Sequence, residues 1–267
     1  MGRLILLTLP VGNLSDITNR VKTALTEGEV FAVEDTRSFK KLLQLLSIDY
    51  SDKFIQSFHE HTQDFEFWLQ KMQKTDLYLC SEAGSPLISD PAYPLIQLAL
   101  ANEIEIDSYG GVSALNYALE LCGLPIQPFT FYGFLSRERK KRNEVYLKLQ
   151  AGGTFFFFES PHRIEKTVSE LVQLYPKAQL AICRELSKKF QQVWRFAAKD
   201  WAKIQSQLIT KGEFVLAISL PAQEQQQQHL ELLAQAVLHS GGQKKDLAKL
   251  LAEILNLKSK DVYQKLV

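Results

Sequence analysis

The sequence has few cysteines, no long apolar run and almost no net charge, and each of these features excludes a class of protein. Its three cysteines lie far apart in apolar stretches without a CxxC pair, which argues against disulfides and structural zinc. No stretch approaches the roughly 18 consecutive apolar residues that a membrane helix needs. The net charge of +1 creates no overall field toward nucleic acid or membrane, so any basic surface must be local. We expect a cytoplasmic protein without a bound metal.

Four widespread cofactor-binding and catalytic motifs are also missing. The sequence contains no GxGxxG, no GxxxxGK[ST], no HExxH and no GxSxG. These absences argue against the common dinucleotide fold, P-loop nucleotide chemistry, zinc peptidases and α/β-hydrolases. His59 and His61 are spaced so that both could hold a metal from one face of a strand, but no third ligand lies nearby, and a chance pair is the simpler interpretation.

The pattern of apolar residues predicts an α/β fold of two domains with a small helical tail. In residues 1–112, strand, loop and helix alternate about five times, which is typical of a parallel sheet with crossover helices. Residues 113–220 indicate a second, mixed α/β unit with its own core. The glutamine-rich stretch 221–228 predicts a linker, and residues 229–267 predict the tail, with helices over 230–238 and 245–255 and from Ser259.

Three helix starts are predicted from side chains that can cap a helix. Asp16 is expected to cap a helix that runs to about Leu25. Asp90 and Ser160 are expected to cap two further helices, each with a proline at its first position. A helix over 39–46 is expected after the polar turn of residues 34–37.

The stretch from Leu77 to Pro91 is the most informative local feature of the sequence. An apolar strand ends abruptly in a loop that contains Gly84 and Pro86 and leads to the next helix. Such a loop presents free backbone N–H groups at the carboxyl end of a strand, where open α/β sheets bind ligands. An ordinary connection between a strand and a helix is the alternative.

Further polar clusters follow other predicted strands or precede predicted helices. If these clusters meet at one edge of the predicted sheets, they form a cleft between the two halves of the chain. Backbone groups in that cleft would hold a polar ligand. These clusters are 10–14, 34–37, 83–90, 110–114, 159–163, 184–188 and 211–213. A separate segment, 137–142, has five basic residues and one acid, and predicts either a solvated helix start or a loop that contacts phosphate.

Six of these segments occur in the order expected for a known family. They are Pro10-Val-Gly-Asn-Leu-Ser-Asp-Ile17, Glu34-Asp-Thr-Arg37, Ser81-Glu-Ala-Gly-Ser-Pro-Leu-Ile-Ser-Asp-Pro91, Glu159-Ser-Pro-His-Arg163, Arg184-Glu-Leu-Ser-Lys188 and Lys211-Gly-Glu213. Together they resemble the bacterial 16S ribosomal RNA (cytidine-2′-O)-methyltransferases of the tetrapyrrole methylase superfamily, over nearly the whole chain. The resemblance implies S-adenosylmethionine in the cleft between two α/β domains, a homodimer, and 16S ribosomal RNA or the small ribosomal subunit as partner.

The resemblance also implies roles for individual residues. Cofactor contacts are implied for Pro10, Gly12, Gly84, Ser85, Pro86, Leu87, Ile88, Ser113, Ala114, Tyr132, Gly212 and Glu213. Contacts with RNA are implied for Arg137, Arg139, Lys140, Lys141 and Arg142. The chain departs from the family pattern in having Gly110-Gly-Val112 in place of Pro-Gly-Pro and Glu82 in place of aspartate.

A sulfonium methyl donor is already activated, so the enzyme mainly has to align the acceptor hydroxyl with the methyl group and the sulfur. Because a ribose hydroxyl is a weak acid, a nearby base or cation would help it to react. The candidates for this role are Glu34, Arg37, Glu159 and Lys188, with Asp35 and His162 beside them. Two alternatives stay open at this point: a small-molecule methyltransferase of the same superfamily, and a non-catalytic relative that binds RNA or protein.

Overall fold

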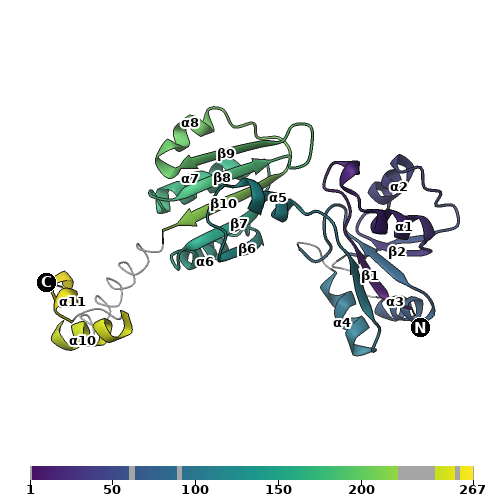
Figure 1. The fold of residues 1–267 in the computed structure, drawn as a ribbon, viewed down its shortest axis with the longest axis horizontal. Helices are drawn as coiled ribbons and strands as arrows, with labels where there is room; N and C mark the ends of the chain where they lie inside the picture. Colours follow the sequence, from purple (N-terminus) through teal and green to yellow (C-terminus); the bar gives the residue numbers. More distant parts are fainter. Residues whose placement is uncertain (1, 60–63, 89–91, 222–243, 256–258, 267) are drawn as a thin grey trace.

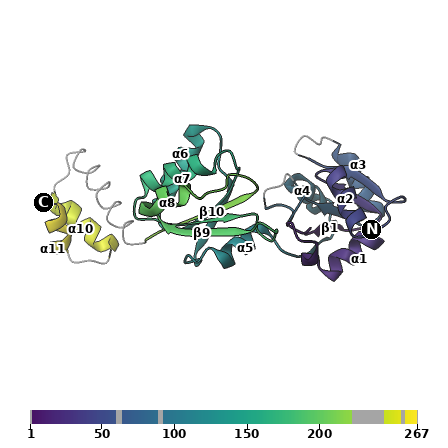
Figure 2. The same cartoon turned by 90° about the horizontal axis from the view of Figure 1, so that it is seen from above.

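The structure is a computed structural model that describes residues 2–59, 64–88, 92–221, 244–255 and 259–266. These residues form two α/β units, each built on a five-stranded sheet, followed by a pair of helices (Figures 1 and 2). The predicted fold class is therefore confirmed.

The first sheet is entirely parallel, as the alternation of strands and helices predicts. Neighbouring strands are in register, with Leu4 opposite Leu77 of the strand on one side and Ile106 of the strand on the other. Across the sheet the strands are β3 (Phe54–Ser57), β2 (Val30–Val33), β4 (Leu77–Cys80), β1 (Leu4–Leu7) and β5 (Ile106–Tyr109).

Both faces of this sheet are covered by helices, because successive strand side chains point to opposite faces. Leu4 packs in the core under α3 and α4, and its neighbour Ile5 packs in the core under α1 and α2. All four strand residues of β2 are buried, as expected for a strand covered on both sides. The helices are α1 (Asn19–Glu27), α2 (Thr36–Leu45), α3 (Phe65–Lys74) and α4 (Tyr93–Ala101).

The strand order places a topological switch point between β1 and β4. The chain leaves β1 toward α1 on one face of the sheet, and leaves β4 toward α4 on the other face. The loops after these two strands therefore diverge at the carboxyl edge of the sheet. In open α/β sheets this divergence creates the crevice in which ligands bind.

The second sheet is mixed, and its strands run in the order β6, β7, β10, β8, β9. Only β6 and β7 are parallel neighbours, whereas β10 pairs antiparallel with both β7 and β8. The amino end of β10 therefore lies at the same edge as the carboxyl ends of β7 and β8. The strands are β6 (Phe129–Phe134), β7 (Gly153–Glu159), β8 (Gln179–Arg184), β9 (Gln192–Ala197) and β10 (Phe214–Leu220).

Helices cover both faces of the second sheet as well. Phe155 and Phe157 of β7 point into the core formed with α6, α7 and α8, whereas Phe156 points to the face covered by α5. Helix α5, which Ser113 caps, packs on this second sheet. The helices are α5 (Ala114–Leu121), α6 (Arg139–Leu149), α7 (Ile164–Leu174) and α8 (Trp201–Gln205).

Two predicted helix caps are wrong, and a third helix begins earlier than predicted. The Thr18 hydroxyl, not Asp16, caps α1, by accepting from the N–H of Val21 at 3.2 Å, and Asp16 instead ends a short 3₁₀ turn. Helix α7 begins at Ile164, because Ser160 uses its backbone carbonyl to close a turn with the N–H groups of Arg163 and Ile164. Helix α2 begins at Thr36, three residues before the predicted start, with Asp35 as its cap.

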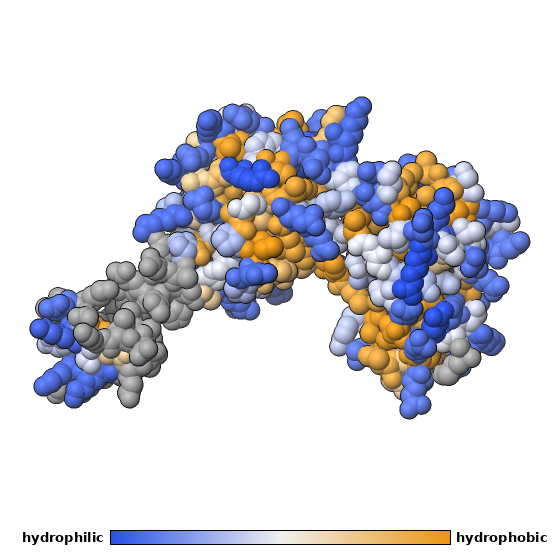
Figure 3. Space-filling view, in the orientation of Figure 1, coloured by the Kyte–Doolittle hydropathy of each residue, from blue (hydrophilic) through white to orange (hydrophobic). Residues whose placement is uncertain are grey.

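The C-terminal helices α10 (Lys244–Leu255) and α11 (Ser259–Leu266) bury Leu247, Ala248 and Val262. Figure 3 shows a mainly hydrophilic exterior where this pair is coloured, as expected when apolar residues face inward. Predictions for residues 222–228, for a helix over 230–238, and for His61, Asp90 and Pro91 lie outside the described residues. Within the part of the chain that is described, no helix is long and apolar enough to span a membrane.

Candidate active site

The loops after β1 and β4 are joined at the switch point by a short antiparallel bridge. The N–H of Leu9 donates to the carbonyl of Gly84, and the N–H of Gly84 donates back to Leu9, each at 2.9 Å. The buried hydroxyl of Ser81 donates to the carbonyls of Ala83 and Gly84 at 3.2 Å, which stabilises the loop from beneath. The two loops thus form one rigid surface at the carboxyl edge of the first sheet.

Backbone conformation explains why a glycine occurs in this loop. Gly84 has φ +75°, a region that side chains disfavour, and a Cβ built there would meet only Val11 Cγ2, at 3.8 Å. The space above Gly84 is therefore open to a ligand. Leu87 adopts φ +78° despite its side chain, a strained conformation of the kind that collects at binding sites.

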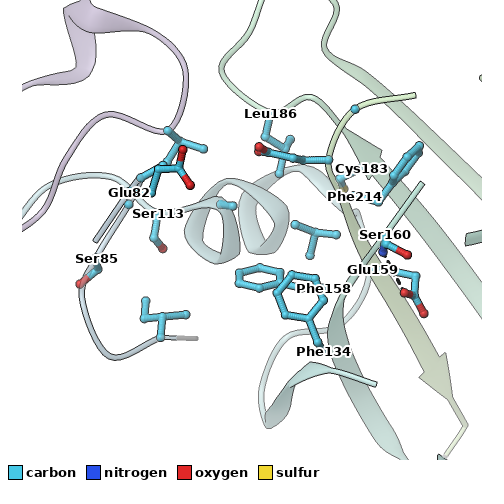
Figure 4. A pocket seen from close by; sticks show the side chains of 18 of the residues that line it. Glu82, Ser85, Ser113, Phe134, Phe158, Glu159, Ser160, Cys183, Leu186 and Phe214 are labelled. Carbon is cyan, nitrogen blue, oxygen red and sulfur yellow. Dashed lines mark hydrogen bonds between the residues drawn. The ribbon is translucent and has the colours of Figure 1, made fainter. Parts of the chain in front are cut away.

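A cavity of about 650 Å³ lies above this surface and is closed on its other side by the second unit (Figure 4). Its volume lies within the range of small-molecule sites. The sequence-predicted residues that line it are Pro10, Glu34, Gly84, Ser85, Ile88, Ser113, Ala114, Glu159, Gly212 and Glu213. Loops distant in the sequence thus meet at one cavity, as the hypothesis of a shared cleft requires.

The second unit contributes an apolar wall that sequence reasoning missed. Phe134, Phe158, Leu186 and Val215 line the cavity from the edge of the second sheet. Cys183 lies beside them, and burial raises the pKa of its thiol to about 12, so that it stays protonated and acts as an apolar group. Strand periodicity shows that such residues alternate between faces, but not which face opens onto a cavity.

The first unit contributes carboxylates to the opposite wall. Glu34 and Glu82 both line the cavity, and the N–H of Glu82 donates to Glu34 Oε2 at 3.0 Å. The hydroxyl of Ser38, on α2, donates to Glu82 Oε1 at 2.9 Å. This small cluster links the loop after β2 to the loop after β4 and directs negative charge into the site.

Glu159 lies in the cavity wall, but its carboxylate is already occupied. Oε1 accepts from the N–H of Ser160 at 2.8 Å, and Oε2 accepts from the Thr167 hydroxyl at 2.6 Å. Arg163 forms an ion pair with it at 3.4 Å, and the side chain is fully buried. Glu159 therefore organises the turn after β7.

Lys188 bridges the two units without entering the cavity wall. Its aliphatic stem covers Gly12 of the first unit, where a Cβ would lie 2.3 Å from Lys188 Cγ. Its ammonium contacts Glu185 at 3.1 Å and Glu213 at 3.0 Å. Although burial opposes the charge, these two carboxylates raise the pKa of Lys188, so that it is a cation at neutral pH. Lys188 is therefore unsuited to accept a proton.

The predicted residues Pro86, Leu87, Tyr132 and Arg37 are not among those that line the cavity. Pro86 is buried within the loop, and Leu87 beside it is exposed. The ring of Tyr132 stacks on Phe157 in the core, with centroids 5.7 Å apart, so that this side chain lies outside the cavity wall. The side chain of Arg37 is 92% exposed and pairs with Asp35 at 3.2 Å.

The basic segment forms the start of helix α6 and not a loop. Arg139, Lys140 and Lys141 are exposed there, as is Arg137 just before the helix. Arg142 is the exception: its side chain is 7% exposed and donates to both carboxylate oxygens of Glu170, at 2.9 and 3.0 Å. Arg142 therefore holds the helix start in place, and its predicted contact with RNA is incompatible with this burial.

Comparisons with known proteins decide the family. The sequence model described as Tetrapyrrole (Corrin/Porphyrin) Methylases matches residues 3–202. The chain belongs to this family. It is 35% identical to "Ribosomal RNA small subunit methyltransferase I" of Halalkalibacterium halodurans over 81% of this chain and 75% of that protein. It is 31% identical to the Bacillus subtilis protein of the same name over 98% of this chain and 93% of that protein.

Solved tetrapyrrole methylase folds match the same architecture. Diphthine synthase superposes with a TM-score of 0.61 at 11% identity, covering 82% of this chain and 90% of that one. Uroporphyrin-III C-methyltransferase from Thermus thermophilus, solved with S-adenosyl homocysteine, gives a TM-score of 0.54 at 14% identity, over 82% of this chain and 97% of that chain. The predicted class, an S-adenosylmethionine-dependent methyltransferase of the tetrapyrrole methylase family, is confirmed.

The residues of the cavity fit this cofactor. The carboxylates of Glu82 and Glu213 suit a ligand that carries a sulfonium and an ammonium group. The apolar wall around Phe158 and Val215 suits the adenosine part. The open space above Gly84 allows a ligand to approach the backbone, as the resemblance implies.

Proposed function

We propose that this tetrapyrrole methylase transfers the methyl group of S-adenosylmethionine to the ribose 2′-hydroxyl of a cytidine in 16S ribosomal RNA. The observation that supports this substrate is the match along 98% of the chain to relatives named for the small-subunit ribosomal RNA. The basic start of α6, which follows Phe134 of the cavity wall in the sequence, supplies a local charge for an RNA phosphate backbone although the net charge is only +1.

When bound, the cofactor supplies an electrophilic methyl group, so that the protein has to orient the acceptor and receive its proton. Glu34 is our candidate for the proton acceptor, because it lines the cavity from the first unit. The carboxylate of Glu159 is occupied by Ser160, Thr167 and Arg163, and Lys188 is a protonated cation. General bases of this kind typically contribute a factor of roughly 10² to 10⁴ to the rate.

The exposed cations have a different proposed role. Arg137, Arg139, Lys140 and Lys141 would contact phosphates, and Arg37 would contribute from the first unit. We place the enzyme in the cytoplasm, where small ribosomal subunits occur, and propose a homodimer.

The test compares 16S ribosomal RNA from a strain with the gene and from a deletion strain. Primer extension at low nucleotide concentration should lose one stop in the deletion strain. Small subunits from that strain should then accept a tritiated methyl group from the purified protein, and the label should survive in an alkali-resistant dinucleotide, because 2′-O-methylation blocks cleavage of the adjacent phosphodiester. An unchanged pattern of stops, together with no transfer to purified subunits, would contradict the proposal.

A further inference from the structure

Strand β6 contains an irregularity that changes the direction of its last side chains. Phe131 pairs with Phe156 of β7, but Phe134 pairs with Phe158, so that three steps on β6 match two steps on β7. Gly133 lies within this bulge at φ +64°, a conformation that favours glycine. Bulges of this kind commonly redirect a side chain next to an active site.

The consequence is that Phe134 and Phe131 lie on the same face of the sheet. In a regular strand two residues three apart point to opposite faces. Here both rings contact Phe158, with centroids 4.8 Å away for Phe131 and 5.5 Å for Phe134. Tyr132 and Leu135 share the other face and belong to the core. The bulge therefore moves an aromatic ring from the core side to the cavity side.

Phe134 is unusually accessible for a phenylalanine in a cavity wall. It is 60% exposed, whereas Phe158 behind it is only partly exposed (Figure 4). Single exposed apolar residues are common on protein surfaces. This one differs because a bulge directs it to the cavity and a second ring supports it from behind.

The chain immediately after Phe134 is held firmly and leads to the basic helix start. Arg163 donates to the carbonyls of Leu135 and Ser136 at 2.9 and 3.3 Å. Arg142 donates to the carbonyls of Ser136 and Arg137 at 3.3 and 3.2 Å. The exposed ring of Phe134 is thus held in a fixed position relative to the exposed cations at the start of α6. Sites for single-stranded nucleic acid combine aromatic rings with cations in this way.

We infer that Phe134, supported by Phe158, is a stacking site for a nucleobase of the RNA substrate at the mouth of the cavity. This inference rests on the proposed function and adds a residue that positions the acceptor. The exposed cations of the α6 start would bind the phosphates that flank the stacked nucleotide. An aromatic face accepts any base, so that Phe134 contributes affinity and orientation, and base identity is read elsewhere.

The experiment measures methyl transfer to small subunits from a deletion strain and, separately, the affinity for S-adenosylmethionine by calorimetry. Phe134→Ala should raise the KM for the subunit about tenfold, within the range found when stacking residues are removed. Its cofactor Kd should stay within twofold of wild type, which also shows that the variant is folded. Phe134→Trp should restore the KM, because an indole also offers a flat aromatic face.

Phe190→Ala is the matched control, because Phe190 is 63% exposed and lies in the β8–β9 connection outside the cavity wall. It should leave KM and kcat unchanged. An unchanged KM in Phe134→Ala would overturn the stacking site, as would an equal loss of cofactor affinity, which would mark Phe134 as a cofactor contact. A wild-type protein that is inactive on small subunits would overturn the proposed function instead, so that the two failures are distinguishable.

Discussion

At the scale of single residues, the site is shaped by which polar atoms already have partners. Glu34 and Glu159 both line the cavity, yet only Glu159 is surrounded by an N–H, a hydroxyl and a guanidinium. The two carboxylates therefore have different roles although each lies at the carboxyl end of an apolar strand. Lys188, another of the candidates, is held by Glu185 and Glu213.

The two carboxylates can be separated by matched substitutions. Glu34→Gln keeps an oxygen that accepts from the N–H of Glu82 but removes the base, so kcat should fall about 100-fold while the cofactor Kd changes little. Glu159→Gln should lower the free energy of unfolding but leave kcat within about fivefold of wild type. Any loss of activity should follow the smaller fraction of folded protein. Single-turnover methyl transfer and calorimetry measure both. A larger loss of kcat in Glu159→Gln than in Glu34→Gln would reverse the assignment.

The ion pairs of Lys188 predict how stability depends on pH. Although burial opposes the negative charge of Glu185, the N–H of Glu213 and the ammonium of Lys188 lower the pKa of this carboxyl from 4.5. The contribution of Glu185 to the free energy of unfolding is therefore fully present above pH 4.5, and it is lost as the pH falls through the pKa of the folded state. The pKa of Lys188 is raised from 10.5. The contribution of Lys188 to the free energy of unfolding is therefore fully present below pH 10.5, and it is lost as the pH rises through the pKa of the folded state.

Lys188→Met should therefore lower the free energy of unfolding by about 1.5 kcal/mol between pH 6 and 9, the range in which both groups are charged. The difference from wild type should shrink as the pH is lowered below about 4.5, because Glu185 then takes up a proton. Urea unfolding at several pH values measures it. Lys189→Met, at the exposed neighbouring position, is the control and should show no such pH-dependent difference.

At the scale of elements, helix α6 combines a buried anchor with an exposed basic start. Arg142 joins α6 to Glu170 of α7, and the hydroxyl of Tyr146 donates to the same carboxylate at 3.0 Å. Burial, followed by the charge of Glu170, raises the pKa of Tyr146 beyond the physiological range, so that it remains a donor. The position of the exposed cations thus depends on the packing of two helices.

Replacing Arg139, Lys140 and Lys141 with alanine should weaken binding to RNA and reduce its salt dependence. Each lost phosphate contact should lower the slope of log K against log salt by about 0.7 to 0.9. Filter binding to small subunits over a range of salt concentrations measures this, and calorimetry should show an unchanged cofactor Kd. The exposed lysines Lys199, in the 3₁₀ turn before α8, and Lys203, within α8, provide the control substitutions. An unchanged salt slope would exclude the α6 start as an RNA contact.

At the scale of the whole molecule, a polar cluster joins the two α/β units beside the cavity. Asp16, in the loop after β1, accepts from the hydroxyl of Tyr117 on α5 at 2.9 Å and from the hydroxyl of Ser187 in the loop after β8. Burial, followed by the hydrogen bond to Asp16, raises the pKa of Tyr117, so that this hydroxyl stays a donor. The cluster helps to hold the two walls of the cavity together.

Asp16→Ala should therefore weaken cofactor binding, although Asp16 does not line the cavity. The loss of about 1 kcal/mol from a hydrogen bond between the units corresponds to an increase in Kd of about fivefold. Asp16→Asn keeps an acceptor oxygen and should bind nearly as wild type. Calorimetry measures the affinity, and hydrogen exchange should show faster exchange in the loop after β8. An unaltered Kd in Asp16→Ala would mean that the cavity does not depend on this contact.

The sequence by itself determined the elements, because their signals are local. The alternating strands and helices of the first unit and the helices α10 and α11 occur where they are predicted, since apolar periodicity acts within one segment. Convergence of Glu34, Gly84, Ser113 and Gly212 on one cavity was also predictable, because they lie at strand or helix ends that a layered α/β fold brings to one edge.

Only the tertiary structure decided what single polar and aromatic side chains do. Asp16 caps no helix because Tyr117 and Ser187 reach it from the second unit, and Arg142 is buried because Glu170 meets it on α7. Phe134 faces the cavity because β6 pairs with β7 through a bulge. In each case the partner of the side chain is distant in the sequence. No local sequence pattern therefore specifies which of the possible orientations of that side chain has the lower free energy.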